Sequence, residues 1–599
     1  MDRNTILAVG LMFAILLGWQ ALVVGPKQQA AAEARRQIAE AELAQAAAGP
    51  GAETPGRSLS GAIGEETSAR SAEARRIPIE TPTLKGTLNL RGATLDDLEL
   101  KDFRETVDDD SPLVRVLSPR SRKDATFVRS GIIVDGKRDS AAEWTAAAGA
   151  RLTPETPLTL TRDQGNIRHE MVLAVDDAFM FTVTHKVING GGDSAALLPY
   201  GYAEQRGVPG DLSNFMILFE GLLGVTDGKL SARKYKKLDK SEKNAIEESG
   251  TGGWVGVTEK YWLAAAIPPQ DQKFDLQIER LQKAKAPTYR SSYQLEGFFL
   301  EPGQEATVTS HLFAGAKVVE TLRDYETELG ITDFDKAVDW GMFFFLTRPI
   351  HWGLHFFGVL TGNYGVAILL LTLVIKALLF PLANASYRSM AGMRKVAPEM
   401  KRIQERYKDD KMKQQQEVMG LYKKYKINPA AGCLPVLMQM PIFFALYKVL
   451  FTTIEIRHEP FLYIPDLSEQ DPTTIFNLFG LLPFDPTLAP VIGPFLGLGI
   501  LPLLMGAAMW VQTKLNPPPA DPTQALVFSF LPLIFMFIFA PFAAGLVLYW
   551  FWNTFLGVVQ QYFIMKGAGA DVDLIGNIKS TFSKGSSPSE PTGSKPAND

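Results

Sequence analysis

The stretch Val366-Ala-Ile-Leu-Leu-Leu-Thr-Leu-Val-Ile-Lys-Ala-Leu-Leu-Phe-Pro-Leu382 is an apolar run that contains a single charged residue, Lys376. With its flanks, the run is long enough to cross a bilayer. An ammonium group inside such a segment costs at least about 2.5 kcal/mol on insertion scales. A charged residue at such a position usually interacts with a polar group inside the membrane, so Lys376 is the first candidate functional residue.

Further apolar runs predict a polytopic membrane protein. Besides the segment at 358–383, spans are expected at 430–454, 491–513, 524–540 and 544–566. The last two adjoin around Pro541 and are together too long for one helix, so a tight reversal is required there. Residues 1–24 form a sixth span, predicted as an uncleaved signal anchor, with a cleaved signal peptide as the alternative.

Loop charges orient these spans. Residues 384–429 contain twelve Lys and Arg against five acids, whereas residues 455–489 contain one Arg and six acids. The positive-inside rule therefore places 384–429 in the cytoplasm and the 455–490 loop outside. Alternation places both termini and the loop 514–523 inside. Lys376 then lies about seven residues, or ~10 Å, from the cytoplasmic end of its span, so snorkelling to the interface is an alternative role.

The remaining segments differ in composition and hydrophobic pattern. Residues 25–75 lack the apolar residues of a core and indicate a flexible linker. Residues 76–334 show short alternating segments separated by turn signals such as Asp135-Gly136 and Asp227-Gly228, which predict a large antiparallel β-sandwich. Residues 335–357 are rich in aromatic side chains and predict an interfacial helix with Trp340 and Trp352 at headgroup depth; a buried helix of the sandwich is the alternative. Residues 567–599 indicate a disordered cytoplasmic tail.

Several kinds of chemistry are excluded. The net charge of −4 gives no global attraction to nucleic acid, and the single cysteine, Cys433, allows no intrachain disulfide. His351 and His355 share a helix face but lack the glutamate of the zinc-hydrolase motif, so no metal site is expected.

The cytoplasmic segment 384–429 predicts a hairpin of two amphipathic helices around Asp409-Asp410, because apolar residues recur at three-to-four spacing on both sides (Met390, Met393, Val396, Met400, Ile403 and Tyr407, then Met412, Val418, Met419, Tyr422 and Tyr425). Its formal charge is 12 − 5 = +7. This charge serves either topology alone or docking to an anionic partner such as ribosomal RNA or lipid headgroups. The candidate docking residues are Arg394, Lys395, Lys401, Arg402, Arg406, Lys408, Lys411 and Lys413.

Polar residues inside the spans are few and therefore informative. Thr372 lies four residues before Lys376, so both occupy one helix face. Gln439 lies in the third segment, and Tyr549 and Trp550 lie in the last. Interhelical hydrogen bonding is the alternative for the amides. Spans two to six contain no acidic residue, which argues against a proton relay and for an unpaired positive charge that faces water.

Several stretches in this order resemble the YidC/Oxa family of membrane protein insertases, closest to its Gram-negative bacterial members. They are Gly362-Asn-Tyr-Gly365, the basic hairpin, Asn428-Pro-Ala-Ala-Gly-Cys-Leu-Pro435, Gln439-Met-Pro441 and Gly545-Leu-Val-Leu-Tyr-Trp550 followed by Gln560-Gln561. The resemblance implies six transmembrane helices with a five-helix core, a periplasmic β-supersandwich and a bacterial inner-membrane location. It implies a membrane insertase and chaperone, not an enzyme, with no cofactor and no small-molecule substrate.

The same resemblance implies a hydrophilic groove lined by Lys376, Thr372, Gln439, Tyr549 and Trp550. The intramembrane charge of the family is typically arginine, so Lys376 keeps the charge but loses the planar five-donor fork. The implied partners are nascent membrane-protein chains, the Sec translocon, membrane lipids and, transiently through cytoplasmic loops, the ribosome. The tail has no excess of basic residues, so no tail-mediated ribosome binding is expected.

Two other classes of function stay open on the residues alone. A secondary transporter would show internal repeats, paired broken helices and intramembrane acids. A membrane-tethered carbohydrate-binding protein or enzyme could use the β-sandwich, although fold alone does not indicate function. Deletion of residues 76–320 separates the classes, since an insertase would still insert.

Overall fold

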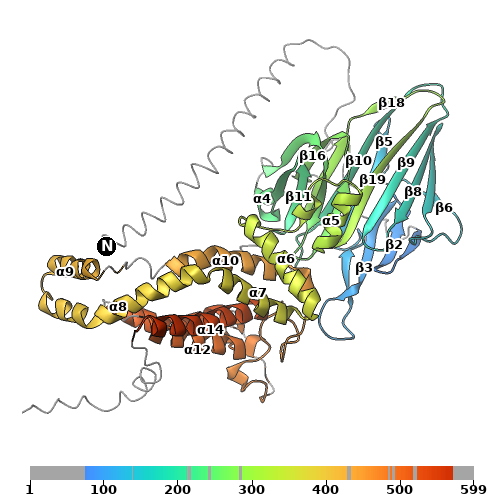
Figure 1. Cartoon of the computed structure of the whole chain (residues 1–599). Helices are drawn as coiled ribbons and strands as arrows, with labels where there is room; N and C mark the ends of the chain where they lie inside the picture. The colour runs from blue at the N-terminus through green and yellow to red at the C-terminus, as the bar shows by residue number, and fades with distance from the viewer. Residues whose placement is uncertain are drawn as a thin grey trace, which may run out of the picture. The chain divides into compact units, whose positions relative to one another are not determined.

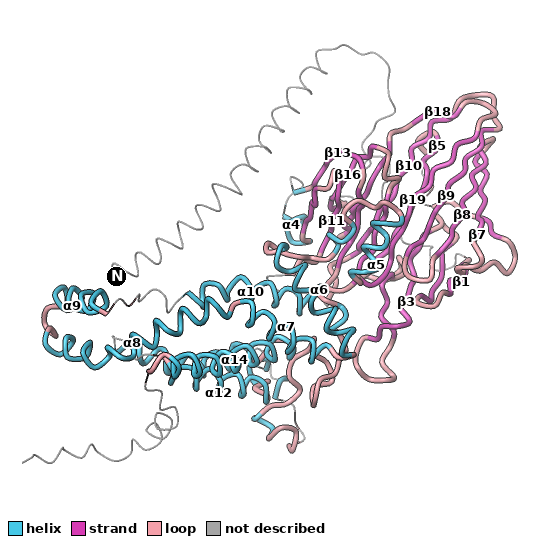
Figure 2. The backbone as a smooth tube through the Cα atoms, viewed as in Figure 1, coloured by secondary structure: helices cyan, strands magenta, loops and turns pink. Residues whose placement is uncertain are grey.

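The structure is a computed structural model that describes residues 75–570, apart from short gaps at 138, 140, 211, 213–217, 241–243, 282–285, 426, 428–433, 483, 485, 489–492 and 517–521. The predicted anchor at 1–24, nearly all of the linker, Cys433 with its neighbours and residues 571–599 lie outside the described residues. Strands fill the first part of the described chain and helices the second (Figure 2).

The strands are β1 (Arg76–Glu80), β2 (Leu84–Asn89), β3 (Thr94–Arg104), β4 (Leu113–Leu117), β5 (Thr126–Val134), β6 (Thr145–Ala146), β7 (Leu158–Gln164), β8 (Ile167–Val175), β9 (Met180–Asn189), β10 (Ala195–Arg206), β11 (Gly221–Thr226), β12 (Lys229–Arg233), β13 (Ile246–Thr251), β14 (Gly253–Thr258), β15 (Trp262–Ile267), β16 (Lys273–Arg280), β17 (Thr288–Leu295), β18 (Phe298–Leu300) and β19 (Glu305–Ala316).

The helices are α4 (Tyr235–Lys240), α5 (Val319–Glu328), α6 (Phe344–Thr361), α7 (Tyr364–Leu378), α8 (Phe380–Arg406), α9 (Lys411–Lys424), α10 (Leu434–Thr452), α11 (Gly493–Leu496), α12 (Ile500–Leu515), α13 (Pro522–Phe539) and α14 (Ala544–Gly567). Short 3-10 turns lie at Phe334–Ala337, Ile454–Ile456, Ile475–Asn477 and Pro486–Leu488.

The strands form two sheets that pack face to face, which confirms the predicted antiparallel sandwich. One sheet has ten strands, with the order β1-β2-β3-β5-β10-β17-β16-β13 and with β4 and β18 at its side. The other has nine strands, with the order β12-β11-β14-β15-β19-β9-β8-β7-β6. Strand β8 alternates between buried and half-exposed residues, as period-two sequence predicts, whereas β5 is buried along its whole length because it lies in the middle of the sandwich.

Two of the predicted turns have the geometry that their residues favour. Asp135-Gly136 and Asp227-Gly228 both adopt positive φ at both positions, 50° and 68° in the first turn and 49° and 70° in the second. Consecutive left-handed residues make the type I′ turn, whose twist matches the flanking strands. The second of these turns joins β11 to β12.

The segment between the sandwich and the first long helix differs from the prediction. A 3-10 turn and a loop precede α6, so the helix begins at Phe344 and not at residue 335. Trp340 is only 6% exposed, lies in the core of the sandwich and donates its indole N–H to the Asp335 carbonyl over 3.0 Å. Its predicted place at headgroup depth is therefore wrong. Trp352 on α6 is 65% exposed, as an interfacial side chain requires.

The apolar stretch around Lys376 is bent rather than straight. Helix α6 runs on to Thr361 and ends at Gly362, whose φ of 66° makes a left-handed C-cap. Helix α7 then ends at Leu378, and α8 continues at an angle of 67°. Pro381 lies in the first turn of α8, where its ring is tolerated, but it could not continue α7. Residues 358–383, expected as a single span, thus comprise the end of α6, all of α7 and the start of α8.

Among the described residues no single helix is both long and apolar enough to cross a bilayer, whereas α7 and α8 pass that test together. Shorter apolar helices run over Gln439–Thr452, Ile500–Leu515 and Val527–Phe539. Helix α14 packs against α7, α10 and α12, and the four helices run side by side in Figure 1. Their shared core includes Ile368, Leu446, Met505 and Leu546.

Two further boundaries of the helical part can be compared with the sequence. Helices α13 and α14 are joined by a tight turn at residues 540–543, where the sequence requires a reversal. The segment expected at 491–513 instead contains the short α11 and then α12 from Ile500. Between them, a Cβ on Gly497 or Gly499 would collide with Gln470 or Asp471, so the glycines allow this close approach and interrupt the helix.

Candidate functional site

Lys376 lies in the last turn of α7, two residues before the helix ends. The final carbonyl groups of a helix have no intrahelical partner and carry partial negative charge. A cation is therefore stabilised at this position, even inside an apolar sequence. The bend at Leu379 thus provides a local reason for the lysine, which a straight span would not.

Three polar side chains converge on Gly557, a buried residue of α14. A Cβ built on this glycine would lie 3.5 Å from Lys376 Nζ, 3.7 Å from Gln512 Nε2 and 4.0 Å from Tyr387 Oη. These groups come from α7, α12 and α8 in turn. Among the described residues, no carboxylate forms an ion pair with Lys376. The arrangement is a polar junction with one uncompensated positive charge in a largely apolar helical core.

Three members of this junction were missed from the sequence. Gln512 is a polar residue inside a predicted span and could have been found by the same argument that selected Gln439. Tyr387 was assigned to the cytoplasmic hairpin, because the bend that starts α8 was not foreseen. Gly557 gives no sequence signal, since a helical glycine can serve many purposes.

Thr372 lies one turn before Lys376 and is buried. Its hydroxyl donates to the Ile368 carbonyl of the same helix over 2.6 Å, so this donor is already used within α7. A second contact in this region comes from Trp552 on α14, whose indole N–H donates to the Leu369 carbonyl over 3.2 Å. The Trp552 bond therefore joins α14 to α7, whereas the Thr372 bond stays within α7.

Gln439, Tyr549 and Trp550 form a second group. The Gln439 amide donates to Tyr549 Oη over 2.7 Å and joins α10 to α14, and Tyr549 is almost fully buried. Trp550 packs edge-on against Phe443, with ring centroids 4.6 Å apart, and against Phe539 at 5.0 Å. Tyr549 and Gly557 are eight residues apart, so the two groups are separated by about 12 Å along α14 at the helical rise.

The hairpin of α8 and α9 closes on a small apolar cluster. Val396, Met400 and Leu421 are buried in it, with Val418 and Tyr422 packed against them. Asp410 caps α9 by accepting the Lys413 backbone N–H over 3.0 Å. Of the residues predicted for the apolar face of the second helix, Met412, Met419 and Tyr425 are instead exposed.

The basic residues of the hairpin divide into two sets. Arg394 donates to the Leu515 carbonyl over 3.1 Å and Lys395 to the Ala568 carbonyl over 2.9 Å. Both acceptors lie at the C-terminal ends of helices, α12 and α14, where a cation is favourable. These two side chains fasten the base of the hairpin. The other six candidates are exposed: Lys401, Arg402, Arg406, Lys408, Lys411 and Lys413.

In the part of the chain that the structure describes, no group of three or more His, Cys, Asp or Glu side chains could hold a metal ion. His351 and His355 stack on one helix face at 6.5 Å between ring centroids. His355 Nε2 lies 2.9 Å from a Glu320 carboxylate oxygen, a contact to α5 beside the sandwich. Their environment is that of packing residues.

Comparison with known proteins places the chain in a family. Residues 356–570 match the family model described as 60Kd inner membrane protein, and residues 76–353 match that of the YidC periplasmic domain. A membrane protein insertase YidC of Maricaulis maris (strain MCS10) is 45% identical, over 96% of this chain and 97% of the relative. That of Beijerinckia indica subsp. indica is 46% identical, over 97% and 99%.

A crystal structure of an active YidC insertase aligns with 82% of this chain and 92% of its own, at 18% identity and a TM-score of 0.34. The family models and the full-length relatives carry the assignment. The chain therefore belongs to the YidC family of membrane protein insertases, which are not enzymes, and residues 76–353 are its periplasmic domain.

Proposed function

We propose that this chain inserts nascent membrane proteins into the bacterial inner membrane through a hydrophilic groove, and that it assists their folding, alone or beside the Sec translocon. The observation that carries the proposal is the polar junction at Gly557, where Lys376, Gln512 and Tyr387 approach the same glycine. Among the described residues, Lys376 has no acidic partner there. Family membership supports the same function.

In the proposed topology the chain crosses the membrane six times. The spans are the anchor at 1–24, the bent α7–α8 pair, α10, α12, α13 and α14, with α6 on the membrane surface. Loop charges support cytoplasmic termini and a cytoplasmic hairpin. The match of residues 76–353 to a periplasmic domain supports an outside location for the sandwich.

Lys376 supplies the electrostatic step. Its ammonium keeps the junction hydrated and attracts acidic residues in the short translocated segment of a substrate. Water in the groove lowers the desolvation cost of moving that polar segment, while the apolar span of the substrate partitions sideways into lipid. Gln439 and Tyr549 form a second polar site of the proposed groove, about 12 Å from the first along α14, and Trp550 presents an aromatic surface beside it.

The exposed face of the hairpin, defined as Lys401, Arg402, Arg406, Lys408, Lys411 and Lys413, docks anionic partners. Ribosomal RNA and anionic headgroups both present the phosphates that such a surface attracts. Arg394 and Lys395 are left out of this surface, because their side chains are bound to helix ends.

The test is insertion of a single-span substrate with an acidic tail into proteoliposomes. Lys376→Ala is expected to impair insertion and Lys376→Arg to retain it, because the role needs charge and not a particular donor geometry. Lys566→Ala removes an exposed lysine at the end of α14 and is the matched control. Equal insertion by Lys376→Ala and the unchanged protein would contradict the proposal.

A further inference from the structure

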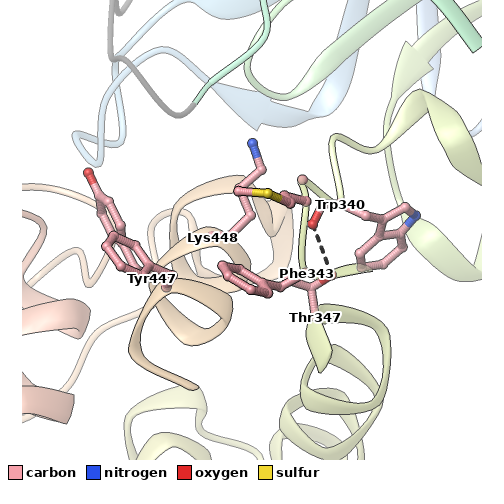
Figure 3. Close-up of a pocket in the computed structure, with 8 residues that line it drawn as sticks. Trp340, Phe343, Thr347, Tyr447 and Lys448 are labelled. Atoms are coloured by element: carbon pink, nitrogen blue, oxygen red, sulfur yellow. Dashed lines mark hydrogen bonds between the residues drawn. The ribbon is translucent and has the colours of Figure 1, made fainter. Parts of the chain in front are cut away.

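A pocket of about 390 Å³ lies between α10 and the segment that leads into α6 (Figure 3). Trp340, Gly341, Met342, Phe343 and Thr347 line one side, and Phe444, Tyr447 and Lys448 line the other. The Thr347 hydroxyl donates to the Trp340 carbonyl over 3.0 Å and fixes the first wall. Figure 3 shows Trp340 and Tyr447 at opposite sides of the pocket.

The chemistry of the walls favours an uncharged occupant. Lys448 is the only charged residue among the lining side chains, and its ammonium forms an ion pair with Asp339. The same Asp339 carboxylate accepts the Phe219 backbone N–H over 2.8 Å. The lysine is thus neutralised within the protein, so the pocket offers aromatic and aliphatic surface rather than a site for an anion.

The surface beside the pocket is also apolar. Met342 is 66% exposed, Phe344 55% and Phe345 53%, and Phe444 on the facing helix is also exposed. Contiguous exposed apolar side chains of this kind mark a surface that is covered in the working protein. In the proposed topology this end of α10 faces the periplasm, so the neighbouring lipid belongs to the outer leaflet.

The size of the pocket selects among apolar occupants. A helix with its side chains is 10–12 Å wide, so one turn of 5.4 Å fills roughly 400–600 Å³. A pocket of about 390 Å³ therefore fully encloses less than one helical turn. A flexible hydrocarbon chain fits, and the volume lies in the range of small-ligand sites.

We propose that this pocket binds one acyl chain of an outer-leaflet phospholipid, with the headgroup outside it. The bound chain would lie between α10 and the segment before α6, so lipid would be part of the joint that connects the helical part to the sandwich. The inference rests on the proposed topology for its depth in the membrane and goes beyond the insertion function.

The test uses the full chain in liposomes that contain a phospholipid with a diazirine group in its acyl chain. After irradiation, labelled peptides are identified by mass spectrometry at increasing mole fractions of the probe. Labelling of residues 342–343 is expected to saturate. Labelling of the exposed Phe530 and Leu533 on α13 is expected to rise linearly, as for bulk lipid.

Phe444→Glu places a carboxylate at a partly exposed position of the pocket and is expected to lower labelling at 342–343 at least tenfold, with α13 unchanged. Phe530→Glu is the matched control and should change only α13. If labelling of residues 342–343 rises linearly with the probe, or is absent while α13 is labelled, the pocket does not bind an acyl chain. The proposed topology is unaffected by either result. If neither residues 342–343 nor α13 is labelled, both the acyl-chain pocket and the proposed topology are contradicted. Preferential labelling of the pocket by a photoreactive single-span peptide overturns the lipid as occupant.

Discussion

Gly557 offers a sharp test of the polar junction, because its two simplest substitutions should behave differently. In Gly557→Ala, the new Cβ would meet Lys376, Gln512 and Tyr387 at 3.5–4.0 Å, which is ordinary van der Waals contact. Alanine also favours a helix interior by about 0.5–1 kcal/mol over glycine. We expect this variant to be as stable as the unchanged protein or more stable by up to that amount, with insertion retained.

Gly557→Leu adds atoms beyond the Cβ, into the space that the Lys376 ammonium and the Gln512 amide occupy. A substrate carboxylate held back from about 3 Å to about 6 Å loses ~0.7 kcal/mol of attraction at ε ≈ 80 and ~2.8 kcal/mol at ε ≈ 20. Those values correspond to about threefold and about 100-fold in a rate or equilibrium constant. Insertion of an acidic-tail substrate should fall within that range.

The assay pairs insertion into proteoliposomes with thermal unfolding of each variant. Gly567→Leu is the matched control, because Gly567 lies in the same helix and a Cβ there meets nothing within 4 Å. Insertion by Gly557→Leu at the unchanged rate would refute the role of the junction. A loss of more than about 1 kcal/mol in the alanine variant would refute the packing described around this glycine.

Three further predictions follow from other contacts. Gln439→Leu and Tyr549→Phe each remove the 2.7 Å hydrogen bond between α10 and α14, and each should lower the free energy of unfolding by about 1–2 kcal/mol. The double variant should lose little more than either single variant, because both changes remove the same bond. Fully additive losses would contradict this hydrogen bond. Arg394→Ala should lower thermal stability, because the Arg394 guanidinium donates a hydrogen bond to a carbonyl at the end of α12. Lys401→Ala should leave thermal stability unchanged and should reduce co-sedimentation of the protein with ribosomes. The reverse pattern would contradict the division of the basic residues into two sets. Burial lowers the pKa of His169 to about 3, so the folded sandwich binds fewer protons than the unfolded chain below the ordinary pKa of 6.5. Its stability should therefore be complete above pH 6.5 and fall by about 2 kcal/mol at pH 5 for this residue, a slope that hydrogen exchange of β8 would report and that His169→Gln would reduce.

Much of the sandwich could be predicted, because its signals are local. Alternation along β8 and β9, and Asp-Gly pairs that favour positive φ, depend on neighbouring residues alone. The segment around Trp340 was misplaced for the opposite reason. An aromatic-rich sequence fits both a membrane surface and a protein core, and only the contacts of the folded chain distinguish them.

The candidate site was predicted in outline and corrected in detail. Lys376 stands out because charge in an apolar run is costly wherever it lies. Its surroundings depend on the bend at Leu379 and on the rotation of α12 and α14, which bring Lys376 and Gln512 to the same glycine, Gly557. Likewise, the number of basic residues in the hairpin does not reveal that Arg394 is bound to the end of another helix.

A charge swap at Lys376 shows whether its ammonium attracts an acidic translocated segment of the substrate. Insertion is measured for the unchanged protein and for Lys376→Glu, each with a substrate whose tail carries aspartates or lysines at the same positions. We expect Lys376→Glu to insert the acidic tail poorly, and we expect a lysine tail to restore insertion by that variant. Equal effects of Lys376→Glu on both tails would contradict this attraction, because the residue would then act without regard to the charge of its substrate.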